Sequence, residues 1–306
     1  MQNDCSAKIY FMTSRRVFIK SASALSAAVL VRGPLQALAA APVIGLQLYT
    51  VRDAMGKDPL STLAKVAQIG YNSVENATYT GTEKFYGMDA ATYKKVLADN
   101  GLKANSGHYR LGEELNKGVP DQGTILHDWQ KAVDDASSVG LKYMVCAYLS
   151  SQERGDLDHY KKLADIFNKA GETCKKSGIQ FCYHNHDFEF EVQNGVFPYD
   201  ILLDKTDKNL VKMEVDLYWI KKAGQDPLAL FQNHPGRFPL WHVKDMSKEA
   251  DQSFAEVGSG IIDFKTIFQH KGQAGMKYFF VEQDKCPGSP FDSIAHSYNF
   301  IKNNLV

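Results

Sequence analysis

The chain has 306 residues, 44% of them hydrophobic, and its 35 acidic side chains balance its 35 basic ones, giving a formal net charge of zero. Proteins that bind nucleic acid or an anionic membrane surface through charge carry a basic excess, so the composition speaks against both partners. The length fits either two small domains or one large α/β barrel, and the order of the elements must decide between them.

The first predicted element is an export leader over residues 1–40. Its twin arginines, in Ser14-Arg15-Arg16-Val17-Phe18-Ile19-Lys20, precede an apolar run from Ala22 to Val31 and an A-x-A cleavage motif at Ala37-Leu38-Ala39. The arrangement resembles a twin-arginine signal, which exports proteins that are already folded. Because the apolar run is short for a bilayer span, we expect a cleaved or disordered leader, no permanent membrane anchor, and a periplasmic or other extracytoplasmic protein whose domain covers residues 41–306.

After the leader, short β-rich runs alternate with longer helical patterns. Asp58-Pro59 can start one helix, and other helical stretches end at Gly70, Gly101, Gly140 or Gly178, each just before a β-run. Eight such units predict a single-domain (β/α)8 TIM barrel. An open doubly wound sheet is the alternative, but no G-x-G-x-x-G motif follows the first run. The eight runs are Val43–Thr50, Ser73–Asn76, Lys103–Gly107, Tyr143–Ala147, Ile179–His184, Val211–Asp216, Pro239–Lys244 and Lys277–Glu282.

Polar side chains at the carboxyl ends of these runs are the candidate site residues, because the active site of an α/β barrel lies at those ends. The two-residue period of a strand places Glu214 and Asp216 on one face, and likewise His242 and Lys244. Buried carboxylates and imidazoles are costly unless they are paired or bound to metal, so their convergence predicts one divalent ion, of Mn, Zn, Co or Fe. The polar residues at the run ends are Gln47, Tyr49, Glu75, Asn76, His108, His184, His186, Glu214, Asp216, His242, Lys244 and Glu282.

Several of these segments together resemble the sugar phosphate isomerase/epimerase family of the xylose-isomerase-like barrel superfamily. The resemblance implies one divalent metal ion held by Glu, Asp, His and Glu from strands five to eight. Carried over by position, Asp216, His242 and Glu282 fall on three ligand places, whereas His184 stands where many members carry the first glutamate. The segments are Ile44–Arg52, Tyr183–His186, Val215–Trp219, His242–Asp245 and Gly258–Phe264.

The histidine in the first ligand place bears on the expected reaction. In members with two glutamates, one carboxylate removes a proton beside a carbonyl and the other returns it on the opposite face. With His184 as a neutral metal ligand, Glu282 remains as the main base. From the family resemblance we expect a metal-dependent isomerase or epimerase that acts on an unphosphorylated sugar or keto-sugar, and the single carboxylate base raises the alternative of elimination.

A lyase or dehydratase that acts on a keto-sugar or 3-keto-glycoside is the alternative, since Tyr183-His184-Asn185-His186 also resembles the inosose dehydratase branch. One base and one Lewis acid suffice for such an elimination. An endonuclease-like hydrolase and a non-catalytic sugar-binding barrel are less favoured. The oligomeric state is not predicted.

Further roles are assigned by position at the barrel mouth. His108 is a candidate general acid, and Lys244 can stabilise an enolate or a leaving oxygen. A Lys244 ion pair with Glu214, deeper in the barrel, fits the sequence equally well. The candidates for sugar binding are Tyr49, His186 and Trp219. His186 also suits an alternative metal ligand or a rim position, and core packing explains the two aromatic residues as well.

Three features receive structural rather than chemical interpretations. Glu189 and Glu191 are expected on a solvated loop edge, and Gly258-Ser259-Gly260 is expected to form a tight loop before a helix. The five cysteines form no C-x-x-C pair, which favours structural thiols and leaves one disulfide open.

Overall fold

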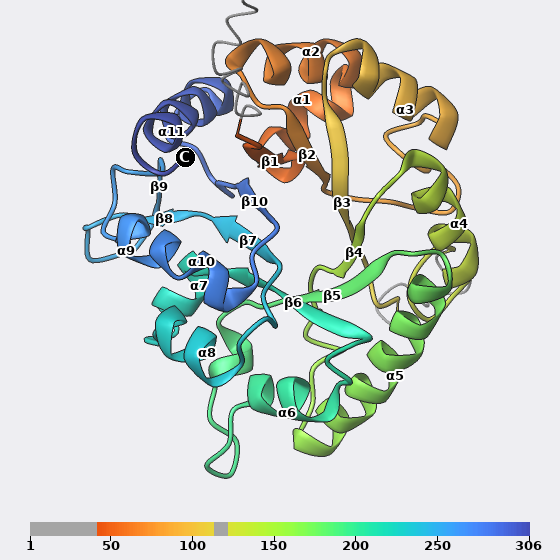
Figure 1. Cartoon of the computed structure of the whole chain (residues 1–306), viewed down its shortest axis with the longest axis vertical. Helices are drawn as coiled ribbons and strands as arrows, with labels where there is room; N and C mark the ends of the chain where they lie inside the picture. The colour runs from red at the N-terminus through yellow and green to blue at the C-terminus, as the bar shows by residue number, and fades with distance from the viewer. Residues whose placement is uncertain (1–41, 113–121) are drawn as a thin grey trace, which may run out of the picture. The chain divides into compact units, whose positions relative to one another are not determined.

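The computed structural model describes residues 42–112 and 122–306 of the chain. Within them, eight parallel strands close into a barrel in the order β1-β10-β7-β6-β5-β4-β3-β2, so that the last strand in the chain pairs with the first (Figure 1). This confirms the predicted (β/α)8 barrel. The predicted leader, residues 1–40, lies outside the described residues.

The barrel strands are β1 Gly45–Gln47, β2 Ser73–Asn76, β3 Lys103–Tyr109, β4 Tyr143–Cys146, β5 Gln180–His184, β6 Val211–Asp216, β7 Leu240–Val243 and β10 Tyr278–Val281. A short antiparallel pair, β8 Asp245–Met246 and β9 Phe254–Ala255, lies outside the barrel sheet. The helices are η1 Leu48–Val51, α1 Arg52–Lys57, α2 Pro59–Ile69, α3 Ala90–Asp99, α4 Trp129–Val139, α5 Leu157–Lys176, η2 Phe188–Phe190, α6 Pro198–Lys205, α7 Leu217–Lys222, α8 Pro227–Asn233, α9 Phe264–Gln269, α10 Lys271–Ala274 and α11 Pro290–Asn304.

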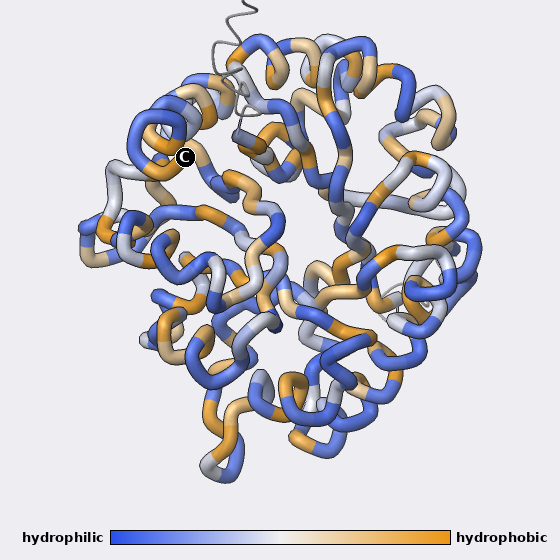
Figure 2. Tube along the Cα trace, in the orientation of Figure 1, coloured by the Kyte–Doolittle hydropathy of each residue, from blue (hydrophilic) through white to orange (hydrophobic). Residues whose placement is uncertain are grey.

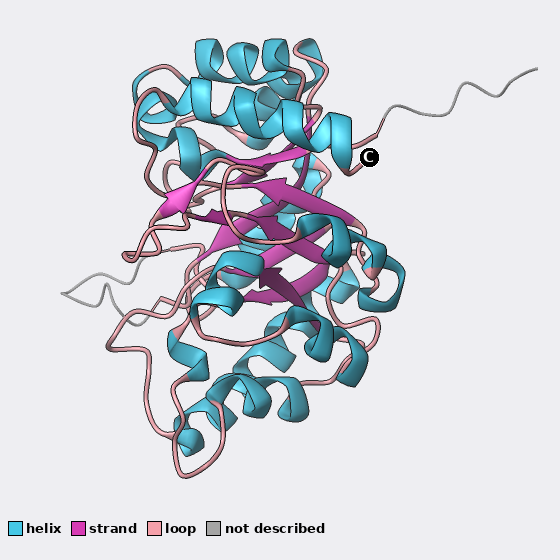
Figure 3. Cartoon of the chain, turned by 90° about the vertical axis from the view of Figure 1, so that its left-hand side faces the viewer, coloured by secondary structure: helices cyan, strands magenta, loops and turns pink. Residues whose placement is uncertain are grey.

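Helices surround the strands on the outside of the barrel (Figure 3). Along the helices, hydrophobic and hydrophilic stretches alternate from turn to turn, as expected when one face packs on the barrel and the other meets solvent (Figure 2). The predicted helix start at Asp58 is present, with its carboxylate accepting the Ser61 backbone N–H at 3.1 Å.

The first strand is shorter than predicted because the chain turns at Gln47. The Gln47 side chain accepts the backbone N–H of Tyr49 at 3.0 Å and starts the 3-10 helix η1. As a consequence, Tyr49 leaves the sheet and stands at the barrel mouth. The third strand is longer than predicted, because Tyr109 still pairs with Cys146 of β4.

The barrel interior is layered, with apolar residues towards the amino ends of the strands and polar residues towards the carboxyl ends. Two residues after members of the apolar layer, on the same strands, come His184, His242 and Glu282. The strand period thus carries these three side chains into the interior above the apolar layer. The apolar layer consists of Val145, Cys182, Leu240 and Phe280.

The loop after β9 confirms the expected tight turn through glycine. The buried Asp245 carboxylate accepts the backbone N–H groups of Gly258, Gly260 and Ile262 at 2.9 to 3.1 Å. The loop amides therefore donate to a carboxylate of the chain itself.

Four cysteines are free in the described part of the chain, namely Cys146, Cys174, Cys182 and Cys286. Burial raises the pKa of the Cys182 thiol well above its usual value, which makes it an unreactive core residue. Among the described residues, no helix is long and apolar enough to cross a membrane.

Gly45→Ala should destabilise the barrel by about 1–3 kcal/mol, because overpacking forces neighbouring atoms to move. The added methyl group would lie 2.6 Å from the carbonyl oxygen of Phe279 and against the ring of Phe280, the residue opposite Gly45 in β10. The matched control is Gly272→Ala in α10, where nothing lies within 4 Å of the added methyl. Urea unfolding measures both, and equal stabilities would contradict the close packing of β1 against β10.

Candidate metal centre and active site

The four predicted metal ligands converge at the carboxyl ends of neighbouring strands. His184 ends β5, Asp216 ends β6, His242 lies in β7 and Glu282 follows β10. His242 Nδ1 lies 2.8 Å from Glu282 Oε2 and 3.9 Å from Asp216 Oδ2. His184 Nε2 lies 3.7 Å from the same Asp216 oxygen. Two ligands of one tetrahedral ion, each about 2.1 Å from it, are about 3.4 Å apart, so one divalent ion fits Asp216, His242 and Glu282. His184 is close to this set through Asp216, and it also groups with His108, Glu214 and His242 as a second possible set of ligands.

Asp216 is held in place by the start of the helix that follows it. Its Oδ1 accepts the backbone N–H groups of Tyr218 and Trp219 at 2.9 and 3.0 Å, which caps α7. Among the described residues, no hydrogen bond reaches the buried Oδ2. Capping therefore fixes one oxygen, and the other faces cations, with the Lys244 ammonium 3.0 Å away.

A second buried polar cluster lies deeper in the barrel, and we call it the barrel floor: Gln47, Glu75, His108 and Glu214. Glu75 Oε2 accepts a hydrogen bond from Gln47 Nε2 at 2.8 Å. His108 Nε2 lies 2.8 Å from Glu214 Oε2 and 3.3 Å from Glu75 Oε2. The floor thus joins residues of β1, β2, β3 and β6 into one network.

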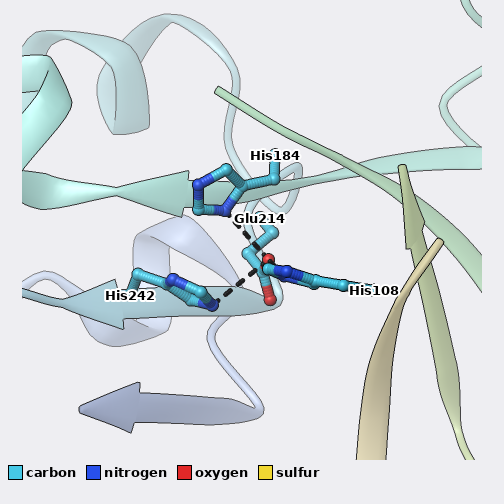
Figure 4. A group of neighbouring side chains, drawn as sticks. All are labelled: His108, His184, Glu214 and His242. Atoms are coloured by element: carbon cyan, nitrogen blue, oxygen red, sulfur yellow. Dashed lines mark hydrogen bonds and ion pairs between the residues drawn. The ribbon is translucent and has the colours of Figure 1, made fainter. Parts of the chain in front are cut away.

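The barrel floor determines which nitrogen of each upper histidine is free. His184 Nδ1 lies 3.0 Å from Glu214 Oε2, and His242 Nε2 lies 2.6 Å from Glu75 Oε2 (Figure 4 shows the Glu214 side of this cluster). An ionised carboxylate only accepts, so when Glu75 and Glu214 are ionised each of these nitrogens carries a proton and donates it. His184 Nε2 and His242 Nδ1 are then the nitrogens left for the metal centre. A carboxylate behind a metal-binding histidine is the usual arrangement in metal sites.

Lys244 lies among the carboxylates of the candidate metal centre. Its ammonium nitrogen is 2.7 Å from Glu282 Oε2, 3.0 Å from Asp216 Oδ2 and 2.9 Å from Asp284 Oδ1. The alternative pairing with Glu214 is therefore not the one observed. Because Lys244 contacts the same two oxygens that face the metal centre, a bound cation would share these carboxylates with it.

The charged groups of the candidate metal centre stabilise one another's charged forms. Burial alone would raise the pKa of Glu282, but Lys244 and His242 hold it well below its usual value. Burial alone would lower the pKa of Lys244, and the carboxylates around it raise it well above its usual value. Glu282 is therefore ionised throughout the neutral pH range, as a base must be. The pKa of His242 is raised well above its usual value by Glu214, Glu282 and Glu75 despite burial.

The pKa shifts of the barrel floor differ from those of the candidate metal centre. Burial, followed by the charge of Glu75, raises the pKa of Glu214 to about 7. Burial would lower the pKa of His108, but Glu75 and Glu214 raise it to about 9. Burial and the charge of His242 lower the pKa of His184 well below its usual value, so its ring is neutral and able to bind a cation.

A cavity of about 900 Å³ opens over the carboxyl ends of the strands. Among the residues of the sequence-based assignment, Tyr49, His108, His184, His186, Lys244 and Glu282 line it. His186 is partly buried against Phe188 and Trp219, and no described residue bonds to its Nδ1. Trp219 is not among the described residues that line the cavity; its ring lies 5.7 Å from Lys244 Nζ.

The expectation that Glu189 lies on a solvated edge is wrong. Glu189 is fully buried in η2, where it accepts hydrogen bonds from the Tyr183 hydroxyl and from the His186 backbone N–H. Glu191 is exposed, as expected. The sequence signal that was missed is the pair of aromatic residues, Phe188 and Phe190, on either side of Glu189. Both are buried, and they carry the glutamate into the interior between them.

Other residues of the site received no role from the sequence. Glu75 and Gln47 were noted only as polar strand ends, yet they orient His242 and support the floor. Asp284 was not considered, because it follows the last strand by three residues and has no motif. Burial, opposed by the charge of Lys244, raises the pKa of Asp284 to about 6.

Residues 63–303 match the xylose isomerase-like TIM barrel family, and the chain belongs to that family. It is 26% identical over 269 residues to the inosose dehydratase of Clostridium beijerinckii, covering 74% of this chain and 85% of that protein. A sugar phosphate isomerase/epimerase structure from Parabacteroides distasonis has a TM-score of 0.73 at 29% identity, covering 87% of this chain and 95% of the other. The IOLI protein, solved with a zinc atom, has a TM-score of 0.66 at 14% identity, covering 86% and 98%, a likeness of fold alone.

Glu189→Gln should lower the free energy of unfolding by about 1–3 kcal/mol, because an amide offers one acceptor where the carboxylate accepts two buried hydrogen bonds. Glu191→Gln is the matched control on the exposed side of the same segment and should stay within about 0.5 kcal/mol of the parent. Urea unfolding at pH 8 compares the two. The buried assignment of Glu189 would be contradicted by two variants of equal stability.

Proposed function

We propose that the chain is a divalent-metal-dependent lyase that eliminates a β-oxygen substituent from a keto-sugar. The observation that carries this proposal is the place of His184 on β5, where Glu214 holds its Nδ1 proton and its Nε2 faces the metal centre. Two-base isomerases use a second carboxylate at that place. Glu282 is then left as the single carboxylate base on the metal, and elimination needs only one.

The roles of the chain's residues follow from the contacts of Glu282. Both of its close contacts, with His242 and Lys244, use Oε2, which is also the oxygen directed at the metal centre. No described residue bonds to Oε1, so this oxygen is available to take the proton from the carbon beside the substrate carbonyl. A bound divalent ion would polarise that carbonyl and stabilise negative charge on its oxygen.

Two further groups assist at the same place. The Lys244 ammonium keeps Glu282 ionised and adds positive charge beside the developing oxyanion. His108 lines the cavity with a pKa of about 9, so its imidazolium can donate a proton to the departing oxygen. The His108–Glu214 hydrogen bond holds the ring in place while it donates.

The relatives support a sugar-modifying enzyme. The inosose dehydratases, at 26–29% identity, carry out an elimination by their name, and they cover more than two thirds of this chain. The predicted twin-arginine leader supports a location outside the cytoplasm, and hence an unphosphorylated substrate.

Isomerisation or epimerisation of a sugar is the second candidate. The Parabacteroides distasonis structure, at 29% identity, is a sugar phosphate isomerase/epimerase by its title. A second proton-transfer group would then be needed on the other face of the substrate. His186 lines the cavity, has no described partner at Nδ1 and has a pKa lowered by burial and by Lys244, so it is the group available for this role.

Asp216→Asn should lower the affinity for the divalent ion by more than tenfold while leaving the fold intact. Loss of an outer partner of a metal ligand already costs about 10–100-fold, and here a ligand oxygen itself is replaced. Asparagine caps a helix as well as aspartate, so α7 keeps its start. Asp226→Asn, which changes the exposed cap of α8 in the same way, is the matched control. Zinc and manganese titrations with calorimetric detection compare the three proteins; unchanged metal affinity in Asp216→Asn would refute the ligand set.

The reaction is decided by incubating the metal-loaded protein in D₂O with keto-inositols, 3-keto-glucosides and free ketoses. We expect an unsaturated product and the release of water or of the aglycone. Proton NMR measures both. Glu282→Gln should lower the rate by about 10²–10⁴-fold, whereas Glu191→Gln should not change it. Deuterium incorporation without loss of water or aglycone would favour the second candidate, and neither process with any substrate would leave the lyase proposal untenable.

A further inference from the structure

The cavity is much larger at its outer part than the metal centre needs. Of the groups that carry the proposed chemistry, His184, Lys244 and Glu282 line the side formed by β5 to β10, and His108 lines the cavity from β3. The remaining lining comes from the segments after β1, β2, β3 and β4. A volume of about 900 Å³ is at the upper end of the range for sites that enclose drug-sized ligands. One sugar ring bound at Glu282 would leave the part above β1 to β4 unfilled.

Two exposed tyrosines stand in this outer part. Tyr49, after β1, is 42% exposed, and Tyr148, after β4, is 46% exposed, although both rings line the cavity. Large aromatic side chains that remain exposed inside a cavity are available for stacking on a ligand, since ring faces pack well against sugar C–H groups.

Each of these tyrosines is fixed by an arginine. The Arg52 guanidinium lies 4.3 Å from the Tyr49 ring centre and donates to the carbonyl oxygens of Tyr49 and Asp284. The Arg154 guanidinium donates to the Tyr148 hydroxyl at 2.6 Å. Rings held in this way lose little freedom when a ligand binds, so the surface is preorganised.

The loop after β2 forms a third wall and holds a strained conformation. Lys84 and Tyr86 have φ angles of 52° and 56°, in the left-handed region that costs of order 1–3 kcal/mol for residues with a side chain. The Tyr86 hydroxyl accepts the Ala77 backbone N–H at 2.9 Å, and Lys84 pairs with Asp135 at 3.1 Å. Strain that is stabilised by such specific contacts is typical of ligand-binding loops.

We infer that this outer part, lined by Tyr49, Arg52, Lys84, Tyr86 and Tyr148, is a binding site for a second sugar ring. The substrate would then be a keto-disaccharide, with the keto-sugar at Glu282 and the other ring on the tyrosines. Stacking surfaces interleaved with charged groups suit a sugar better than an aromatic aglycone, because a sugar presents hydroxyl groups beside its C–H faces. This inference rests on the proposed lyase function and names its substrate.

The corresponding reaction is balanced without a co-reactant. Glu282 takes the proton from the carbon beside the carbonyl, and the electron pair of that C–H bond forms the new carbon–carbon double bond. The C–O bond to the second sugar breaks, its electron pair leaves with the oxygen, and that oxygen takes one proton from the His108 imidazolium, which equals in number the proton taken by Glu282. The products are an unsaturated keto-sugar and a free sugar.

The test measures binding of unoxidised sugars, which cannot react, to the full-length protein by calorimetry. Cellobiose, maltose and trehalose are compared with glucose and with 4-nitrophenyl glucoside. We expect at least one disaccharide to bind at least tenfold more tightly than glucose. Tyr49→Ala should reduce this disaccharide-to-glucose ratio at least fivefold, and Tyr49→Phe, which keeps the ring, should retain it. Ile261→Ala, an exposed apolar residue that is not among the described cavity residues, is the control and should retain it too.

The outcomes separate this inference from the proposed function. Equal affinities for glucose and all disaccharides overturn the second-ring site, even if keto-monosaccharides undergo elimination. Tighter binding of 4-nitrophenyl glucoside than of every disaccharide overturns the assignment to a sugar in favour of an aromatic aglycone. A disaccharide preference that depends on Tyr49, without any elimination of keto-substrates, supports the site and refutes the lyase.

Discussion

Two buried carboxylates beneath the barrel mouth, Glu75 and Glu214, control the chemistry above them. Each accepts a proton-bearing nitrogen of one histidine, so that His242 and His184 present their other nitrogens upward. Without the carboxylates either ring nitrogen could carry the proton, and either histidine could turn. Burial makes this arrangement costly unless every charge has a partner, and His108, between the two glutamates, provides one. The orientation of the candidate ligands His184 and His242 therefore depends on Glu75 and Glu214 beneath them.

The balance of charge explains why a divalent ion suits this site. Five carboxylates, Glu75, Glu214, Asp216, Glu282 and Asp284, face three groups whose pKa values are raised, His108, His242 and Lys244. Above about pH 7, where all five carboxylates are ionised, the site carries two excess negative charges, which a divalent cation would neutralise. Binding through His242 Nδ1 releases the proton that this nitrogen shares with Glu282. Glu214, with a pKa of about 7, can take up a proton as the balance changes.

The sequence predicted the features that follow from strand periodicity and from residues that end helices. The alternation of β-runs with helices that end at glycine predicted the barrel, and the positions of His184, His242 and Glu282 at the ends of their runs placed them at one mouth, where the structure brings them together. Their roles as ligands remain predictions. Contacts between distant segments could not be read in this way. The bond between Glu75 and His242 joins residues 167 positions apart, and Glu189 is buried because its neighbours pack inward. The Glu75–His242 contact has no local sequence signature, whereas the burial of Glu189 has one in the flanking Phe188 and Phe190.

The same network links the proposed reaction to the proposed substrate. Because Glu214 holds His184, the β5 side of the metal centre is occupied by a neutral ring, and proton abstraction is restricted to the side of Glu282. A substrate that loses a bulky group needs room for that group beside the base, and β1 borders the Glu282 side of the barrel because it pairs with β10. Such room lies above β1 to β4, next to His108 and the two exposed tyrosines. The base therefore constrains two features of the proposed reaction. Its position after β10 determines where elimination takes place and where a bulky leaving group can lie.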